Sequence, residues 1–212
     1  MTQIELLDQT HPVKKLSELK AAVDACRRCP LYKNATQGVP GEGKAGAPLM
    51  LIGEQPGNDE DLAGKPFVGP AGRVLNQALI EAGIDRSKTY VTNAVRHFKY
   101  EPRGKRRLHK RPNANEIERC RWWTELERAL VEPKLIVAMG ATAARGLLAK
   151  AVTIAQRRGQ VFALPGGATH ALVTIHPSFL LRIQDADDKA REYAAFVADL
   201  KLAAKFAKKA RA

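Results

Sequence analysis

The sequence predicts an α/β fold, in which helices cover both faces of a mostly parallel sheet of four strands. The chain has 212 residues, which suits one domain over 1–212 and allows a core without disulfides. Its apolar runs are short and end in Gly, Pro or polar residues, as buried parallel strands do. Segments with helical spacing of apolar residues lie between these runs, which is typical of consecutive βαβ units.

The expected elements follow one another along the chain. An amphipathic helix is expected over 14–29, and a Gly-rich irregular stretch over 34–48. The basic stretch over 96–112 has no clear period and is expected to be a loop. The strands are expected at 49–53, 89–95, 135–139 and 171–175, and the other helices at 71–83, at 116–131, from 140 and from about 189.

The charge of the chain points to a polyanionic partner. Lys and Arg number 35 against 22 Asp and Glu, and the formal net charge is +13. Within 96–111 there are eight Lys or Arg and one acidic residue, Glu101. Such clustering favours nucleic acid as the partner. A second basic stretch, 201–211, is expected to be a solvated helix face.

Other classes of protein are not favoured by the sequence. Residues 1–7 lack the basic start and apolar core of a signal peptide, and no apolar run approaches the roughly 18 residues of a membrane span. Three cysteines are an odd number for a secreted disulfide framework. Neither a Walker A motif nor a GxGxxG fingerprint is present. We therefore expect a soluble cytoplasmic monomer with no membrane partner.

Polar residues follow three of the expected strands. Gln55, Asn93 and His176 should converge, because the carboxyl ends of parallel strands lie along one edge of the sheet, where ligands bind. One such residue is more often a cap, but three together favour a site for a small polar molecule. Asn93 offers both a donor and an acceptor to a base edge, and His176 could hydrogen-bond a developing oxyanion. Phe67 could stack on a planar ring, although an isolated Phe is more often core.

The cysteines suggest a metal site. Cys26 and Cys29 have the C-x-x-C spacing, and Cys120 lies on the apolar side of an expected helix. This spacing suits an iron–sulfur cluster, and a zinc site could use the same ligands. Cys120 could also be a buried free thiol.

Five motifs carry a resemblance to a known family. They are Gly53-Glu54-Gln55-Pro56-Gly57, Phe67-Val68-Gly69-Pro70-Ala71-Gly72, Thr92-Asn93, Lys105-Arg106-Arg107-Leu108-His109 and His176-Pro177-Ser178. Over about residues 26–180 the sequence resembles the iron–sulfur branch of the uracil-DNA glycosylases, and within it the UdgX type. The first and last motifs are shared across that branch, whereas the Lys-Arg-Arg-aliphatic-His insertion is particular to the UdgX type and carries the finer resemblance.

The resemblance implies a three-layer α/β/α fold with a pocket for an extruded uracil. Phe67 would stack on the uracil, Asn93 would read its N3–H and O4 edge, and His176 would donate to O2 as the base leaves. The partner would be uracil-containing DNA, either a single strand or a duplex from which the base is flipped out. The other pocket residues that the resemblance implies are Gly53, Gln55 and Asp61, with Gln55 also a catalytic candidate.

The resemblance also implies a covalent step. In the UdgX type His109 attacks C1′ of the sugar and stays bonded to the DNA, and Glu54 is the candidate to orient it and accept its proton. From the residues alone, His109 would be one more phosphate contact in a basic loop. The residues expected to contact DNA are Arg96, Lys99, Lys105, Arg106, Arg107, Lys110 and Ser178.

An iron–sulfur cluster, most simply 4Fe–4S, is implied as a structural cofactor. Its ligands would be Cys26, Cys29, Cys120 and His97, because His97 stands where relatives that turn over have a fourth Cys. Zinc on the same ligands and a phosphate contact from His97 are the alternatives. One position departs from the UdgX pattern, since Asn58 replaces the usual Asp.

Three functions are therefore compared. The first is a suicide-type uracil-DNA glycosylase that ends covalently attached to DNA. The second is a hydrolytic uracil-DNA glycosylase with turnover. The third is a non-catalytic iron–sulfur module that binds nucleic acid.

Overall fold

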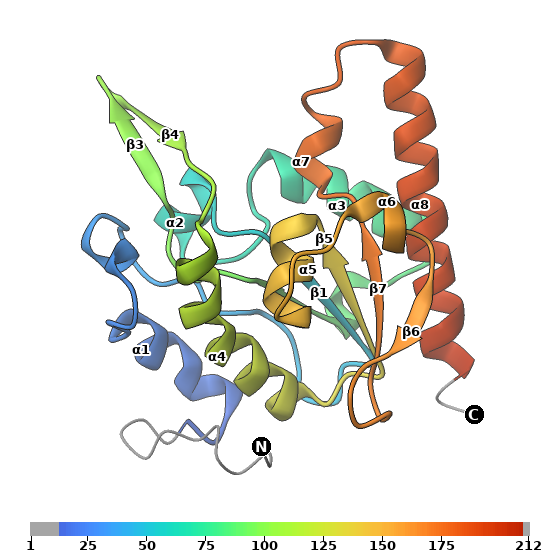
Figure 1. The fold of residues 1–212 in the computed structure, drawn as a ribbon, viewed down its shortest axis with the longest axis horizontal. Coiled ribbons are helices and arrows are strands. Elements are labelled where there is room, and N and C mark those ends of the chain that lie inside the picture. The colour runs from blue at the N-terminus through green and yellow to red at the C-terminus, as the bar shows by residue number, and fades with distance from the viewer. Residues whose placement is uncertain (1–12, 210–212) are drawn as a thin grey trace.

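The computed structural model describes residues 13–209 and confirms the expected α/β fold (Figure 1). The central sheet has the strand order β2-β1-β5-β7-β6. The expectation of four strands is wrong, because β6 (Val161–Ala163) adds an antiparallel edge beside β7. Three residues are too few to display a period, so this strand carries no signal of its own. The parallel strands are β1 (Leu49–Gly53), β2 (Thr89–Asn93), β5 (Leu135–Met139) and β7 (His170–Thr174).

Helices cover both faces of the sheet and complete three layers (Figure 1). Successive residues of β1 alternate between two hydrophobic cores, because side chains of a strand point to opposite faces in turn. One core is closed by α3 (Pro70–Glu81) and α8 (Ala186–Lys209). The other is closed by α5 (Ala141–Leu148) and the end of α4 (Ala114–Val131).

The N-terminal segment packs against α4 in a third hydrophobic cluster. The helix expected over 14–29 is only partly right, because the α-helix covers only α1 (Leu19–Asp24). Pro30 disfavours helical backbone in the residue before it, and that residue is extended. Two 3-10 turns flank α1, namely η1 (Leu16–Glu18) and η2 (Pro30–Lys33).

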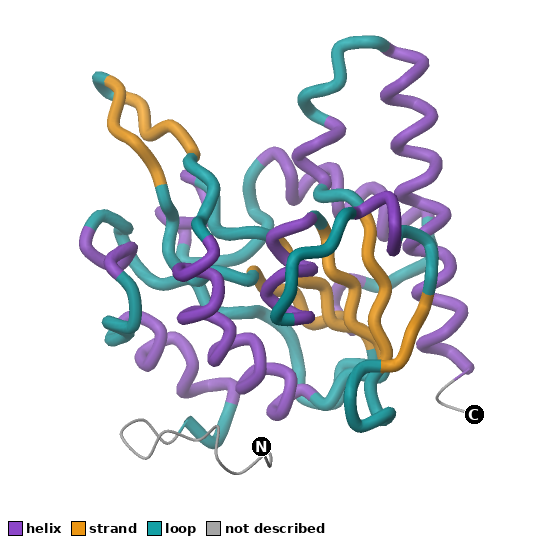
Figure 2. The backbone as a smooth tube through the Cα atoms, viewed as in Figure 1, coloured by secondary structure: helices purple, strands orange, loops and turns teal. Residues whose placement is uncertain are grey.

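The basic segment over 96–112 is not a loop, contrary to expectation. It contains an antiparallel hairpin of β3 (Tyr100–Arg103) and β4 (Arg106–His109), which projects from the body of the protein (Figures 1 and 2). Gly104 has a φ of 57°, which allows the tight two-residue turn at the tip. Both faces of the hairpin carry charged residues, so its sequence lacks the alternation of apolar and polar residues by which a strand is recognised.

The remaining elements are short. Across residues 13–209 no helix is both long and apolar enough to cross a membrane. The expectation about residues 1–7 concerns residues that the structure does not describe. The same holds for the end of the basic stretch over 201–211. The short elements are α2 (Asn58–Ala63), η3 (Arg86–Lys88), α6 (Ile154–Arg157) and α7 (Pro177–Leu180).

Candidate active site

A cavity of about 1190 Å³ opens at the carboxyl ends of the parallel strands. Gln55, Asn93 and His176 all line it, so the expected convergence of strand ends is present. The register explains part of this arrangement, because Gly53 pairs with Asn93 and sets the end of β1 beside the end of β2. His109 also lines the cavity, from the base of the hairpin.

The aromatic side of the cavity depends on the absence of a side chain at Gly53. A β carbon there would overlap the Asn93 side chain and the ring of Phe67. The Phe67 ring lies 5.9 Å from the His176 ring, and 5% of the residue is exposed. Phe67 has a φ of 57°, an unusual conformation for a bulky residue. Gly72 makes room for it, because a β carbon at position 72 would overlap the Phe67 carbonyl.

His176 is held in a defined protonation state. Burial, which is the largest effect, and the charge of Arg182 lower its pKa to about 4, so the ring is neutral at pH 7. Its Nδ1 accepts a hydrogen bond from the backbone N–H of Ser178 at 3.2 Å. The proton of the neutral ring therefore sits on Nε2. His176 can donate that proton in a hydrogen bond to an anion without being charged itself.

Glu54 and His109 face each other across the cavity mouth. His109 Nε2 lies 3.4 Å from Glu54 Oε1. Burial lowers the pKa of His109, and the charge of Glu54 opposes that shift. The second carboxylate oxygen, Oε2, accepts a hydrogen bond from the Thr142 hydroxyl at 2.6 Å and lies 3.8 Å from Nε of Arg111.

The side chain of Gln55 is committed to the hairpin. Its Nε2 donates to the carbonyl oxygens of Lys99 and Lys110 at 3.1 and 3.0 Å, and its Oε1 accepts from the Lys99 N–H. These bonds join the two ends of the hairpin to the end of β1. They leave the Gln55 amide positioned to hold the hairpin rather than to read a base.

Arg107 and Asp61 form a second attachment of the hairpin to the body. Asp61 is fully buried and lies outside the cavity lining, and its carboxylate accepts from the Arg107 Nη1 at 2.6 Å and from the backbone N–H of Thr36. Arg107 also donates from Nε to Asn58 Oδ1 at 2.9 Å and lies over the rings of Phe98 and Tyr100. We therefore assign Arg107 and Asp61 to positioning rather than to phosphate or substrate contact. The Asp usual at position 58 would offer the same acceptor as Asn58.

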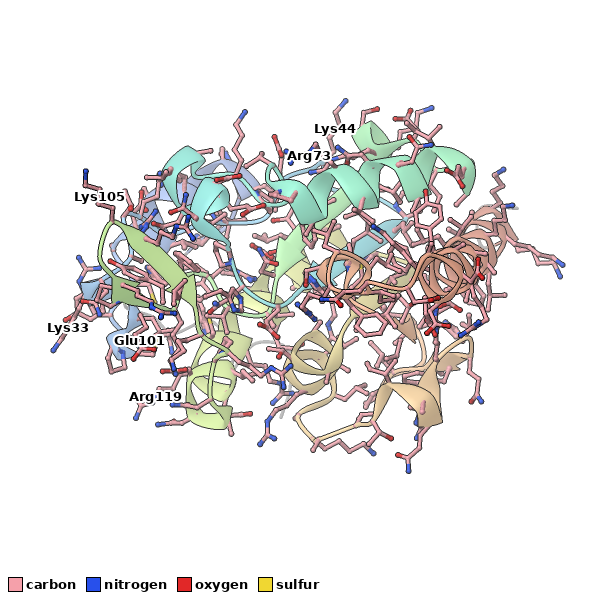
Figure 3. All side chains as sticks on the ribbon, turned by 90° about the horizontal axis from the view of Figure 1, so that it is seen from above. Lys33, Lys44, Arg73, Glu101, Lys105 and Arg119 are labelled. Carbon is pink, nitrogen blue, oxygen red and sulfur yellow. The ribbon has the colours of Figure 1, made fainter. Side chains whose placement is uncertain are left out.

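The other basic residues differ in their availability to DNA. Arg96 is completely buried in an ion pair with Glu127 at 2.8 Å, so it cannot contact a phosphate, contrary to expectation. Lys99 and Lys110 pair with acidic neighbours. Lys105 and Arg106 are exposed at the hairpin tip, and Lys105 extends away from the body (Figure 3). Ser178 contacts His176, and its hydroxyl accepts from Arg182.

The cysteines gather in the N-terminal hydrophobic cluster. Cys29 and Cys120 are buried and Cys26 is partly exposed. Burial raises the pKa of Cys120 to about 12, and burial lowers the pKa of His97 to about 4. N–H groups of Arg96 and Trp123 donate to the sulfurs of Cys120 and Cys26.

Within residues 13–209 no three His, Cys, Asp or Glu side chains come close enough to hold one metal ion. The structure therefore shows no assembled site for zinc or for a cluster among these described residues. The N–H groups at two of the sulfurs are donors of the kind that thiolate ligands of a cluster accept.

Together, the fold and the cavity define an α/β protein with a large cavity at the strand ends of its sheet, lined by both polar and apolar side chains. A profile of the uracil DNA glycosylase superfamily matches residues 40–201. A Type-4 uracil-DNA glycosylase of Thermotoga maritima is 38% identical over 161 residues, which cover 76% of this chain and 80% of the relative. A Type-4 enzyme of Pyrobaculum aerophilum is 34% identical over 173 residues, 79% and 85% of the two chains. The chain belongs to the uracil DNA glycosylase superfamily.

A Type-5 uracil-DNA glycosylase of Thermus thermophilus is also similar. It is 32% identical over 190 residues, which cover 73% of this chain and 83% of the relative.

Thr142 is a residue of the site that sequence reasoning missed. Thr142 follows the expected third strand by three positions, yet its hydroxyl bonds the Glu54 carboxylate. Thr142 could have been found from its position just after β5, because the other site residues were inferred from the same carboxyl edge of the sheet.

Proposed function

We propose that the chain is a uracil-DNA glycosylase of the UdgX type, which excises uracil from DNA and stays bonded to the sugar through His109. The observation that carries this proposal is the pairing of His109 with Glu54 at the mouth of the cavity. A phosphate contact would need no carboxylate partner, whereas a nucleophile that must lose a proton does.

Uracil release is the first half of the proposed reaction. Phe67 stacks on the extruded base and Asn93 hydrogen-bonds its edge. As the bond between C1′ and N1 breaks, its electron pair leaves with the uracil, and the Nε2–H of His176 stabilises the negative charge at O2. The neutral state of His176 supports this role, because it donates without giving up its proton.

Capture by His109 is the second half. The ring nitrogen that does not face Glu54 bonds to the positively charged C1′, and the N–H on the other side transfers its proton to the Glu54 carboxylate. The product is a neutral alkylated imidazole, which is a poor leaving group. The DNA therefore remains attached and the protein reacts once.

DNA binding is assigned to the exposed tip of the hairpin. Lys105 and Arg106 are free of the ion pairs that engage Lys99 and Lys110 at the hairpin base. They would contact phosphates without reading sequence. Ser178, next to His176, would contact the same strand.

We also propose an iron–sulfur cluster on Cys26, Cys29, Cys120 and His97. It would supply a structural link between the N-terminal segment and α4, close to the hairpin. The burial of Cys29 and Cys120 and the neutral imidazole of His97 support this ligand set.

A hydrolytic enzyme with turnover is the second candidate. The similarity to relatives named Type-4 uracil-DNA glycosylases favours it. In that reaction Glu54 would position a water molecule for attack on C1′, instead of orienting His109.

Electrophoresis under denaturing conditions after incubation with a uracil-containing oligonucleotide separates these functions. The covalent mechanism predicts a band that carries both protein and DNA and survives heat and detergent. Free abasic product would indicate turnover, and unchanged DNA would indicate a binding module. In the His109→Ala variant the shifted band should vanish while uracil release continues, because water can then reach C1′. A shifted band from His109→Ala would exclude His109 as the nucleophile.

A further inference from the structure

We infer that Thr142 is a positioning residue for the covalent step, because its hydroxyl fixes the Glu54 carboxylate so that one oxygen faces His109. This inference rests on the proposed covalent function, and it adds a residue that the family motifs do not include.

The geometry divides the two carboxylate oxygens of Glu54 between two partners. The Thr142 hydroxyl donates to Oε2 at 2.6 Å, while Oε1 lies 3.4 Å from Nε2 of His109. A hydrogen bond from a hydroxyl to a carboxylate is short and strong. Because the carboxylate is planar, holding Oε2 also determines where Oε1 points.

Arg111 approaches the same oxygen but is a weaker constraint. Its Nε is 3.8 Å from Oε2, and 76% of its side chain is exposed. A long exposed side chain at that distance contributes little orientation. Thr142 is only 5% exposed and therefore holds Glu54 from inside the protein.

The position of the Thr142 hydroxyl is set by a rigid part of the fold. Thr142 lies in the first turn of α5, whose residues Ala143 and Leu147 pack in the hydrophobic core. A β-branched side chain in a helix has few rotamers. His109, in contrast, comes from a projecting hairpin, so Glu54 is the link between the core and the nucleophile.

This arrangement affects capture more than release. Uracil departs from a pocket formed by Phe67, Asn93 and His176. Within residues 13–209 the side-chain hydrogen bond of Thr142 goes to Glu54 and not to any of these three. Once C1′ is positively charged, His109 competes with water for it. An aligned Glu54 favours His109, so loss of the Thr142 hydroxyl should change the ratio of adduct to free abasic product.

The test compares wild type with two variants, one that lacks the hydroxyl at position 142 and one that keeps it. Thr142→Val keeps the shape but cannot donate, and Thr142→Ser keeps the donor. Thr124→Val is the matched control, because Thr124 is also buried in a helix and its hydroxyl has no hydrogen-bond partner among the described residues. Adduct formation and uracil release are followed together in a single turnover with uracil-containing DNA, and thermal unfolding is recorded for each variant.

We expect Thr142→Val to form the adduct roughly 10-fold or more slowly, the effect of one hydrogen bond to a charged group. Uracil release should change little, and the abasic fraction should rise. Thr142→Ser should recover most of the adduct rate, and Thr124→Val should match wild type. Suppose that wild type forms the adduct. The assignment of Thr142 would then be overturned if Thr142→Val slowed uracil release and adduct formation equally, or if it did not slow adduct formation. Absence of adduct in wild type would overturn the covalent function itself.

Discussion

The Arg107→Met variant tests whether the hairpin must be held against the body for His109 to react. In the native structure Arg107 Nη1 lies 2.6 Å from Asp61, whose side chain is fully buried, while 19% of the Arg107 side chain is exposed. Leaving one partner of a buried ion pair uncompensated costs about 3–5 kcal/mol. Partial exposure of Arg107 places this pair near the lower end, about 3 kcal/mol.

That cost favours states in which the hairpin leaves its docked position. A change of about 3 kcal/mol lowers the docked-to-undocked equilibrium constant by about 100-fold. Adduct formation should fall by up to the same factor, since His109 is two residues from Arg107 on the same strand. Uracil release should be nearly unchanged, because Phe67, Asn93 and His176 do not belong to the hairpin.

The assay is a single-turnover time course that measures adduct on denaturing gels and free uracil in the same samples. Arg103→Met is the matched control, because Arg103 is an exposed residue of β3 in the same hairpin and is not among the assigned DNA contacts. A thermal scan detects any global loss of stability. The reasoning is refuted if Arg107→Met keeps the wild-type adduct rate, or if Arg103→Met slows adduct formation as much.

Four further predictions follow from the site. His176→Ala should slow uracil release by roughly 10²–10³, the cost of one oxyanion donor, with single-turnover release as the measurement. Because the pKa of His109 lies below its usual value, the ring stays neutral further into acid, so adduct rates should fall only below about pH 6.5 in a rate–pH profile. Replacing Lys105 and Arg106 with Ala should flatten the salt dependence of binding to uracil-free DNA, measured by titration at several salt concentrations. Protein purified without air should contain iron and sulfide by chemical analysis, and zinc without iron would contradict the proposed cluster.

Most of the fold could be predicted because buried parallel strands leave a strong pattern. The runs at 49–53 and 135–139 are apolar throughout and match β1 and β5 residue for residue. β6 has only three residues, and the hairpin is charged on both faces, so neither displays its period. Pro30 explains why no helix continues through Cys29, and this could have been read from the sequence, but α1 already ends at Asp24.

The site could be predicted as a set of residues but not as a set of contacts. Strand ends placed Gln55, Asn93 and His176 at one edge, and the structure brings them into one cavity. The sequence did not distinguish a basic residue that is free from one that is engaged within the protein. Arg96 is buried against Glu127, a residue 31 positions away, and such pairs depend on tertiary packing.

The main chain at Phe67 has a consequence for the fate of the product. Its left-handed conformation raises the free energy of the folded chain by about 1–3 kcal/mol. The rest of the fold compensates for this strain before any ligand binds. The ring that we propose to stack on uracil is therefore already in place, and such a preformed pocket should retain free uracil. Retention of the product would delay each new cycle of a hydrolytic enzyme. A protein that reacts only once has no second cycle to delay, so slow departure of the base carries no penalty for it.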